Sequence, residues 1–252
     1  MEDYFEWCGY HWKPSMDGGR IIHPRQPWQW YSSDSITRDS KDNLELFVKK
    51  NPKDVKYWDG TIYHPIYEVS TMRSIEEFGY GTFSCQMMMP IGRNLSASFW
   101  LSGDGNWPPE IDIEEGWTGD NSNWFRWGER YFPYFKPSWR TTTNVHYRDE
   151  QMNKTHVGSR NISIFNQPKD PSENFVRYKC VWNPNEISFF ANNVLVRKIT
   201  GNVCRQLTDN ITNPEKGWET NVIFNVWTED PDKCKIDMIQ PMIIKNFIYE
   251  PL

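Results

Sequence analysis

The chain has 252 residues and a formal net charge of −5. This length suits one large domain, and we expect a single domain over residues 1–252. The acidic balance, with no basic cluster of more than two or three residues, argues against a nucleic-acid surface. No apolar run approaches the roughly 18 residues that a membrane-spanning helix needs, so we expect no membrane partner.

Aromatic residues make up 16% of the chain, and 14 of them are Trp. Aromatic side chains dominate core energetics, so some of these rings belong to the core. A polar chain with so many Trp also predicts rings that are half exposed, and the C–H faces of sugars stack on such rings. The composition therefore fits a carbohydrate groove, with an aromatic-rich core as the simpler alternative.

The five cysteines are scattered and none forms a CxxC pair. An odd, scattered set favours reduced, buried thiols over a disulfide framework. The N-terminal segment Met1–Trp7 has neither the basic nor the apolar region of a secretory signal. The localisation stays open, and we expect action outside the producing cell, through a removed signal, lysis or a virion.

Strand patterns recur along the chain, and helical periodicity never extends beyond two turns. Apolar or alternating runs bounded by turn residues occur at 44–48, 81–89, 96–101, 175–182, 187–191, 194–197, 221–227 and 242–249. Asn192 and Asn193 separate two of these runs and tolerate the positive φ of a tight hairpin. An aromatic stretch at 122–139 without any period predicts a long surface loop. We predict an all-β jelly-roll sandwich of two antiparallel sheets, with a carbohydrate-binding cleft on its concave face.

The segment Trp107–Glu115 reads as a strand with an unusual row of carboxylates. A regular strand sends alternate side chains to one face, so Glu110, Asp112 and Glu114 share a face. Their mutual repulsion costs roughly several tenths of a kcal/mol, which predicts that the charge is used. One use is a pair of carboxyls that act as nucleophile and acid on a glycosidic bond. The alternative is a solvated acidic edge strand that resists aggregation.

Three stretches together, Phe78–Phe83, Met89–Leu101 and Trp107–Glu115, resemble glycoside hydrolase family sixteen. The acidic motif with the Phe-Trp pair upstream of it is the specific part. Weaker similarity continues at 144–147, 178–190, 223–226 and 244–249, so the resemblance covers nearly the whole chain. It implies a β-jelly roll and a retaining endo-glycosidase that hydrolyses a β-linked polysaccharide without a cofactor.

Two positions depart from the pattern of that family. Asn246 stands where many members have an Asp beside a structural calcium ion, so we predict no metal. Asn192–Asn193 replaces the usual Asp-Gly turn, which the chemistry of tight turns tolerates.

The family uses two spacings of its acidic residues, and this sequence satisfies both. Plain alternation places Glu114 on the face of the two upstream carboxylates, whereas a β-bulge returns Glu115 to that face. The residues around Trp107 and His146 resemble the bulged branch of laminarinases, agarases and carrageenases, and a turn at Gly116 follows directly. We predict the bulge, with Glu114 as a charge in solvent or behind the reacting groups.

On this prediction Glu110 is the nucleophile and Glu115 the acid/base, with Asp112 between them to orient Glu110 and adjust the local charge. The expected substrate-binding residues are aromatic stacking candidates, one histidine and one arginine: Trp100, Trp107, Trp117, Trp227, His146 and Arg73. Considered alone, each Trp is more often a core residue and His146 is as often structural. We expect at least two of the Trp side chains to line the cleft.

Guanidinium groups after the acidic strand bear on the substrate. Arg126, Arg130 and Arg140 suit the sulfate groups of a galactan, or they pair with nearby acids in the same loop. We therefore place a red-algal galactan, such as carrageenan, porphyran or agarose, slightly ahead of a β-1,3/1,4-glucan. Two other functions stay open: a non-catalytic carbohydrate-binding jelly roll, as in a viral attachment protein, and a transglycosylase on the same site. We expect a monomer whose partner is the polysaccharide.

Overall fold

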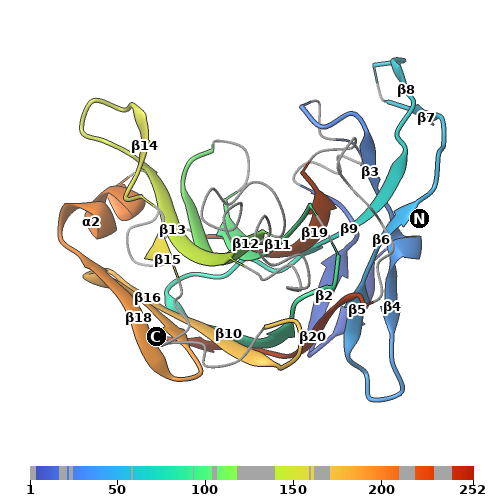
Figure 1. Cartoon of the computed structure of the whole chain (residues 1–252). Coiled ribbons are helices and arrows are strands. Elements are labelled where there is room, and N and C mark those ends of the chain that lie inside the picture. Colours follow the sequence, from blue (N-terminus) through green and yellow to red (C-terminus); the bar gives the residue numbers. More distant parts are fainter. Residues whose placement is uncertain are drawn as a thin grey trace, which may run out of the picture.

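The computed structural model describes residues 4–16, 22, 25–57, 59–92, 94–103, 107–117, 140–158, 160–161, 171–209, 219–229 and 240–252. Within these ranges the chain is almost entirely β-structure, and two sheets lie one above the other (Figure 1). The prediction of an all-β sandwich is confirmed. The expected loop at 122–139 and Cys234 lie outside the described residues.

The upper layer in Figure 1 is an eleven-stranded sheet in the order β1-β2-β9-β19-β11-β12-β13-β14, with β3 and β6 beside β9 and β15 beside β13. Adjacent strands are antiparallel except for the parallel pair β3 and β9. Its strands are β1 (Phe5–Trp7), β2 (Tyr10–Lys13), β3 (Gln29–Tyr31), β6 (Val48–Lys50), β9 (Tyr67–Ser74), β11 (Leu95–Ser102), β12 (Glu110–Trp117), β13 (Arg140–Arg148), β14 (Lys154–His156), β15 (Arg160–Asn161) and β19 (Asn221–Thr228).

The lower layer is a seven-stranded sheet in the order β18-β17-β16-β10-β20-β5-β4. Its strands are β4 (Ile36–Arg38), β5 (Leu44–Leu46), β10 (Gly81–Met88), β16 (Val176–Asn183), β17 (Glu186–Ala191), β18 (Val194–Thr200) and β20 (Met242–Pro251). A small hairpin, β7 (Val55–Lys56) with β8 (Ile62–Tyr63), the 3-10 helix η2 (Ser33–Ser35) and the helix α2 (Asn202–Asp209) complete the described part. Strands rise above the upper sheet at both of its ends, so its outer face is concave (Figure 1).

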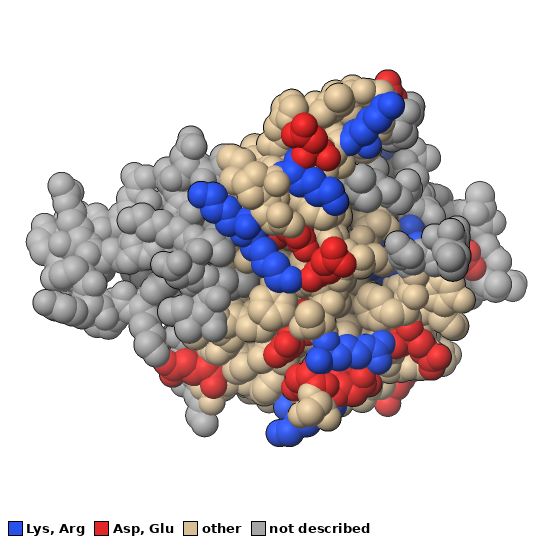
Figure 2. Space-filling model, turned by 90° about the vertical axis from the view of Figure 1, so that its right-hand side faces the viewer, with Lys and Arg blue, Asp and Glu red and all other residues tan. Residues whose placement is uncertain are grey.

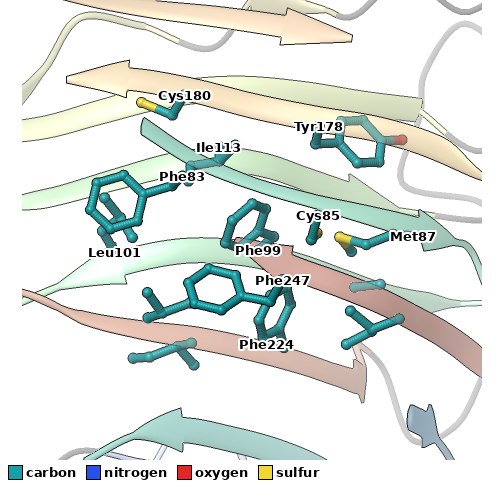
Figure 3. Packing of buried hydrophobic residues seen from close by; sticks show 14 of the residues in the cluster. Phe83, Cys85, Met87, Phe99, Leu101, Ile113, Tyr178, Cys180, Phe224 and Phe247 are labelled. Carbon is teal, nitrogen blue, oxygen red and sulfur yellow. The ribbon is translucent and has the colours of Figure 1, made fainter. Parts of the chain in front are cut away.

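The core fills the space between the two sheets. In β10, Phe83, Cys85 and Met87 alternate with polar residues and are fully buried, as a strand with one buried face requires. Their side chains pack against side chains from β11, β16, β19 and β20 (Figure 3). Phe99 and Phe224 stack at the centre with ring centroids 4.6 Å apart. This aromatic packing explains part of the high Trp and Phe content.

The cysteines in the described part are all free thiols. Cys85, Cys180 and Cys204 are buried, as predicted, whereas Cys8 is exposed. Cys8 lies in the turn between β1 and β2 and has a φ of 54°, so its side chain cannot follow the inward alternation of a strand.

The predicted hairpin between β17 and β18 is confirmed, because both residues of its turn have positive φ, 49° at Asn192 and 67° at Asn193.

No helix in the described part of the chain is long and apolar enough to cross a bilayer. On the face formed by the N-terminal strands, basic and acidic side chains alternate (Figure 2). This face therefore creates no broad field of one sign.

Strand β12 contains the irregularity that distinguishes the two possible spacings of the acidic residues, plain alternation and a β-bulge. Asp112 lies opposite Trp100 of β11, but the next residue of β11, Phe99, lies opposite Glu114. Ile113 is therefore the extra residue of a β-bulge, and the pairing with β13 shifts at the same place. Both Ile113 and Glu114 are buried beneath the sheet.

The bulge decides the surroundings of Glu114. Its side chain is fully buried, and neither carboxyl oxygen has a hydrogen-bond partner among the described residues. The expectation that Glu114 lies in solvent or behind the reacting groups as a charge is wrong, because the extra residue turns it toward the core. Burial and the neighbouring carboxylates of Glu115 and Asp112 raise the pKa of Glu114 well above its ordinary value of 4.5.

The substitution Glu114→Gln should change how stability depends on pH. Because the pKa of Glu114 is raised in the folded state, its contribution to the free energy of unfolding is complete only below about pH 4.5, its ordinary pKa. Above that pH the unfolded chain ionises first, and wild-type stability falls by up to about 1.4 kcal/mol per pH unit from this residue. Urea unfolding at several pH values between 4.5 and 7 should show Glu114→Gln gaining on the wild type as pH rises.

The exposed Glu250 in β20 provides the matched control, since Glu250→Gln removes a carboxylate that water already solvates. Its unfolding free energy should run parallel to that of the wild type. A constant difference between Glu114→Gln and the wild type over this pH range would contradict the burial of a neutral carboxyl.

Candidate active site

A cleft opens on the concave face of the upper sheet, above β11, β12 and β19. It encloses about 510 Å³, part of it open to solvent, and its lining combines carboxylates with aromatic rings. The lining residues are Met16, Gln26, Ser98, Trp100, Glu110, Asp112, Glu115 and Trp227. The three carboxylates of the predicted site therefore come together in one cleft.

Glu115 reaches this cleft because of the bulge. After the extra residue, Glu115 lies opposite Ser98 of β11 and Thr142 of β13. It thus shares the outer face with Glu110 and Asp112. The Thr142 hydroxyl donates to the backbone carbonyl oxygen of Glu115 at 3.3 Å and holds the strand just after the bulge.

In the described part of the chain, two nitrogen-bearing side chains lie beside the Glu110 carboxylate. The indole Nε1 of Trp107 donates to Glu110 Oε2 at 3.0 Å. The His146 Nε2 lies 3.4 Å from Glu110 Oε1 and 3.4 Å from an oxygen of Asp112. The hydrogen bond from Trp107 favours the ionised form of Glu110.

Close packing of the carboxyls makes their titrations interdependent. Burial and then the charge of Asp112 raise the pKa of Glu110, while the hydrogen bond from Trp107 lowers it. Burial, Asp112 and then Glu229 raise the pKa of Glu115. At neutral pH the cluster therefore holds fewer negative charges than it has carboxyls. The hydrogen bond from Trp107 is the contact that favours the ionised form of Glu110.

His146 lies at the centre of a polar network on β13. Its Nε2 is 3.1 Å from the amide nitrogen of Asn144, whose Oδ1 accepts from the Val145 N–H at 2.9 Å. Unprotonated, this Nε2 accepts from Asn144; protonated, it offsets the charge of the two nearby carboxylates. The ring also contacts the rings of Trp107 and His156, with centroids 5.6 and 5.5 Å away.

The four predicted Trp residues have different positions. Trp100 and Trp227 line the cleft, and their indole N–H groups donate to Asn225 and Glu229 at 2.7 and 2.9 Å. Trp107 lies at the rim with 44% of its surface exposed. Trp117 is half buried at the end of β12 and does not line the cleft.

Arginines occupy less central places. Arg73 lies on β9, away from the carboxylates, and its guanidinium donates to Asn221 Oδ1. Arg126 and Arg130 lie outside the described residues. Arg140 begins β13 opposite Trp117, and the structure describes its backbone alone.

Several cleft residues were not predicted from the sequence. Asn225 and Asn144 are polar residues within otherwise buried strands, and Glu229 follows β19 directly. A polar residue at the outward positions of a strand with an apolar inner face is the signal that would have indicated Asn225 and Asn144. Met16 and Gln26 come from the N-terminal region, where no pattern points to the cleft.

One group of side chains in the described part has the geometry to hold a cation. Single donor atoms of Glu110, Asp112 and His146 all lie within 4.8 Å of one another. These are the groups that would act on a sugar, so a cation there would occupy the place of the substrate. The expectation of no metal remains a prediction.

The family model described as "Glycosyl hydrolases family 16" matches residues 24–238. The chain belongs to glycoside hydrolase family 16. It is therefore a glycoside hydrolase, as predicted. A search of curated proteins finds no match.

Solved structures of this fold family are similar to the chain at low sequence identity. The laminarinase catalytic domain of Thermotoga petrophila has a TM-score of 0.61 at 17% identity, covering 100% of this chain and 99% of that one. Porphyranase B of Zobellia galactanivorans has a TM-score of 0.63 at 17% identity, covering 98% and 87%. The κ-carrageenase of Pseudoalteromonas carrageenovora has a TM-score of 0.58 at 11% identity, covering 88% and 86%. At these identities the likeness establishes the fold.

The substitution Trp107→Phe should raise the pKa of Glu110. It removes the indole donor and keeps an aromatic ring at the rim. A hydrogen bond to a charged group contributes about 1.5–3 kcal/mol, so the acid limb of the kcat/KM profile should move to higher pH by about one unit. The matched control is Trp100→Phe, whose lost donor served Asn225.

Measured pH profiles of the two variants separate the possible roles of Trp107. Trp100→Phe should keep the acid limb where the wild type has it. If Trp107→Phe keeps it there too, the indole N–H does not stabilise the Glu110 carboxylate.

Proposed function

We propose that this enzyme is an endo-glycosidase that hydrolyses a β-linked polysaccharide with retention of anomeric configuration, with Glu110 as nucleophile and Glu115 as acid/base. The observation that carries the proposal is the placement of Glu110, Asp112 and Glu115 on one face of β12, inside one cleft, while Glu114 faces the core. Double displacement requires two carboxyls in one cleft, one that attacks the sugar and one that gives and takes a proton. Glu110 and Glu115 lie in such a cleft and have different neighbours.

In the first step Glu110 attacks the anomeric carbon, and Glu115 donates its proton to the leaving glycosidic oxygen. The Trp107 indole N–H donates to Glu110 and favours its carboxylate form before the attack. Asp112 lies between the two glutamates on the same face, where its charge favours the protonated form of Glu115. The ester formed with Glu110 is neutral.

In the second step Glu115 acts as the base. Loss of the negative charge on Glu110 lowers the affinity of Glu115 for its proton, so Glu115 takes a proton from water as the water attacks the anomeric carbon. Glu110 then leaves as a carboxylate, and the product keeps the original configuration. Trp100 and Trp227 on the cleft floor offer ring faces against which sugar units stack.

The substrate is a β-linked glucan or a galactan of red-algal type. Family membership is compatible with both, and the similar structures include enzymes named for laminarin, porphyran and κ-carrageenan. A reducing-end assay with laminarin, lichenan, agarose, porphyran and κ-carrageenan tests this proposal. Release of oligosaccharides from one of them, with the original anomeric configuration in the first products as measured by NMR, supports the proposal. Transfer products in place of hydrolysis would indicate a transglycosylase.

Three substitutions by Gln should have different effects on the reaction. Glu110→Gln should abolish hydrolysis, because the amide is isosteric but far less nucleophilic. Glu115→Gln should lower polysaccharide hydrolysis by about 10²–10⁴-fold and act mildly on aryl glycosides with good leaving groups, which need little protonation. Glu114→Gln is the matched control and should retain most of the activity.

Kinetics on a polysaccharide and on an aryl glycoside measure these effects. Azide should rescue Glu110→Ala and give a glycosyl azide of inverted configuration. If Glu114→Gln is the severe variant and Glu115→Gln the mild one, the assignment of the acid/base is wrong.

A further inference from the structure

Trp107 is an exposed ring with a defined contact in the cleft. Its indole N–H donates to Glu110 Oε2 at 3.0 Å, although 44% of the residue is open to solvent. Trp107 precedes β12 and belongs to no strand, so no sheet ladder fixes its backbone. An exposed side chain has several rotamers open to it, and other contacts must therefore keep the indole N–H on the carboxylate.

Such contacts come from the hairpin of β13 and β14, which rises above the upper sheet (Figure 1). The register of the hairpin places His146 opposite His156 and Arg148 opposite Lys154. Alternate residues of a strand share a face, so the two pairs lie on one face of the hairpin. The ring of Trp107 lies against this face, with its centroid 5.6 Å from that of His146.

Two cations on this face contact different parts of Trp107. The Arg148 guanidinium donates to the Trp107 carbonyl oxygen at 3.2 Å and so holds the backbone. The Lys154 ammonium lies over the indole, 4.9 Å from the ring centroid, which is within the range of a cation–π interaction. The backbone and the ring of Trp107 are thus held by the same hairpin.

The pairing of the two cations supports a role for them. Like charges directly opposite each other destabilise a pair of strands, so Arg148 opposite Lys154 has a cost. Trp107 lowers this cost, because its carbonyl oxygen accepts from one cation and its electron-rich ring face attracts the other. Arg148 also donates to the carbonyl oxygen of Met152 at 3.3 Å within the same hairpin.

The hairpin is itself held at its turn and at its base. At the turn, Asp149 accepts from the backbone N–H groups of Gln151 and Asn153 at 3.0 and 2.8 Å. At the base, the Arg197 guanidinium of β18 donates to the carbonyl oxygen of Val157 at 3.0 Å and links the hairpin to the lower sheet. A side chain that is supported by a rigid element keeps its geometry, so this hairpin sets the position of the indole.

We propose that Arg148 and Lys154 are positioning residues that act through Trp107 and keep its indole N–H on the Glu110 carboxylate. The inference rests on the proposed function, in which Glu110 is the nucleophile. His146 contacts Trp107 too, but its Nε2 also lies 3.4 Å from Glu110, so its substitution would change the surroundings of the carboxylate directly. The hydrogen bond of Arg148 and the cation–π contact of Lys154 are made to Trp107.

Proton exchange at the Trp107 indole tests this positioning. The full chain is labelled with ¹⁵N-Trp, and the indole signal of Trp107 is identified by its loss in Trp107→Phe. In Arg148→Gln, which removes a charge-assisted hydrogen bond, exchange of this N–H with water should be about tenfold faster. In Lys154→Gln, which removes an exposed cation–π contact, it should be about threefold faster. Arg177→Gln, which removes an exposed arginine from β16 of the lower sheet, is the matched control and should leave the rate unchanged.

The pH profile of kcat/KM separates positioning from a direct effect of charge. Arg148→Gln should move the acid limb to higher pH, in the direction expected of Trp107→Phe, because the Glu110 carboxylate loses its donor for part of the time. In the Trp107→Phe background the same substitution should not move the limb further, because the indole N–H is already absent. A positive charge that acted on Glu110 directly would still be lost in that background, and the limb would move again.

Unchanged exchange in both Arg148→Gln and Lys154→Gln, or a further move of the acid limb in the Trp107→Phe background, would overturn the proposal. If Arg148→Gln does not fold, Lys154→Gln supplies the exchange measurement from a change at one exposed side chain. Proton exchange requires no turnover, so the two proposals fail separately. Faster exchange in the variants of a protein that cuts none of the polymers would leave the positioning of Trp107 standing and reject the proposed function.

Discussion

The extra residue at Ile113 is the constraint on which the site depends. Strand β12 lies over the core and beneath the cleft, so each residue must face one or the other. The bulge lets the strand place Glu115 outward after two consecutive buried residues, Ile113 and Glu114. The cost is a carboxyl in the core without a hydrogen-bond partner among the described residues, and burial raises its pKa well above the ordinary value, which favours the neutral form.

The proposed chemistry depends on the different surroundings of the three glutamates in strand β12. Glu110 receives an indole N–H from Trp107, which favours its carboxylate form. Glu115 lies near Asp112 and Glu229, whose charges favour its protonated form. Glu114 faces the core. In the proposed mechanism the different roles of acid and nucleophile therefore depend on the neighbours of each glutamate, since the residue type is the same in all three.

Periodicity was enough to predict the sandwich, its hairpin at Asn192–Asn193 and the face that carries Glu110 and Asp112. It was not enough to place Glu114, because an acidic residue in the core contradicts the ordinary preference for solvent. The partners of Trp107 and Arg73 could not be predicted either. Strand register depends on contacts between segments far apart in the chain, such as Arg73 with Asn221, and local patterns do not contain them.

The central claim is that three adjacent glutamates occupy three electrostatic environments set by one bulge. Carbon-13 NMR of Glu labelled at the side-chain carboxyl, assigned with single Gln variants, measures each one between pH 4 and 10. The signal of Glu114 should stay at its protonated position well above its ordinary pKa of 4.5, while those of Glu110 and Glu115 titrate together in coupled steps. If Glu114 titrates with Glu110 while Glu115 remains fixed, the strand is regular and the assignment of the site is contradicted.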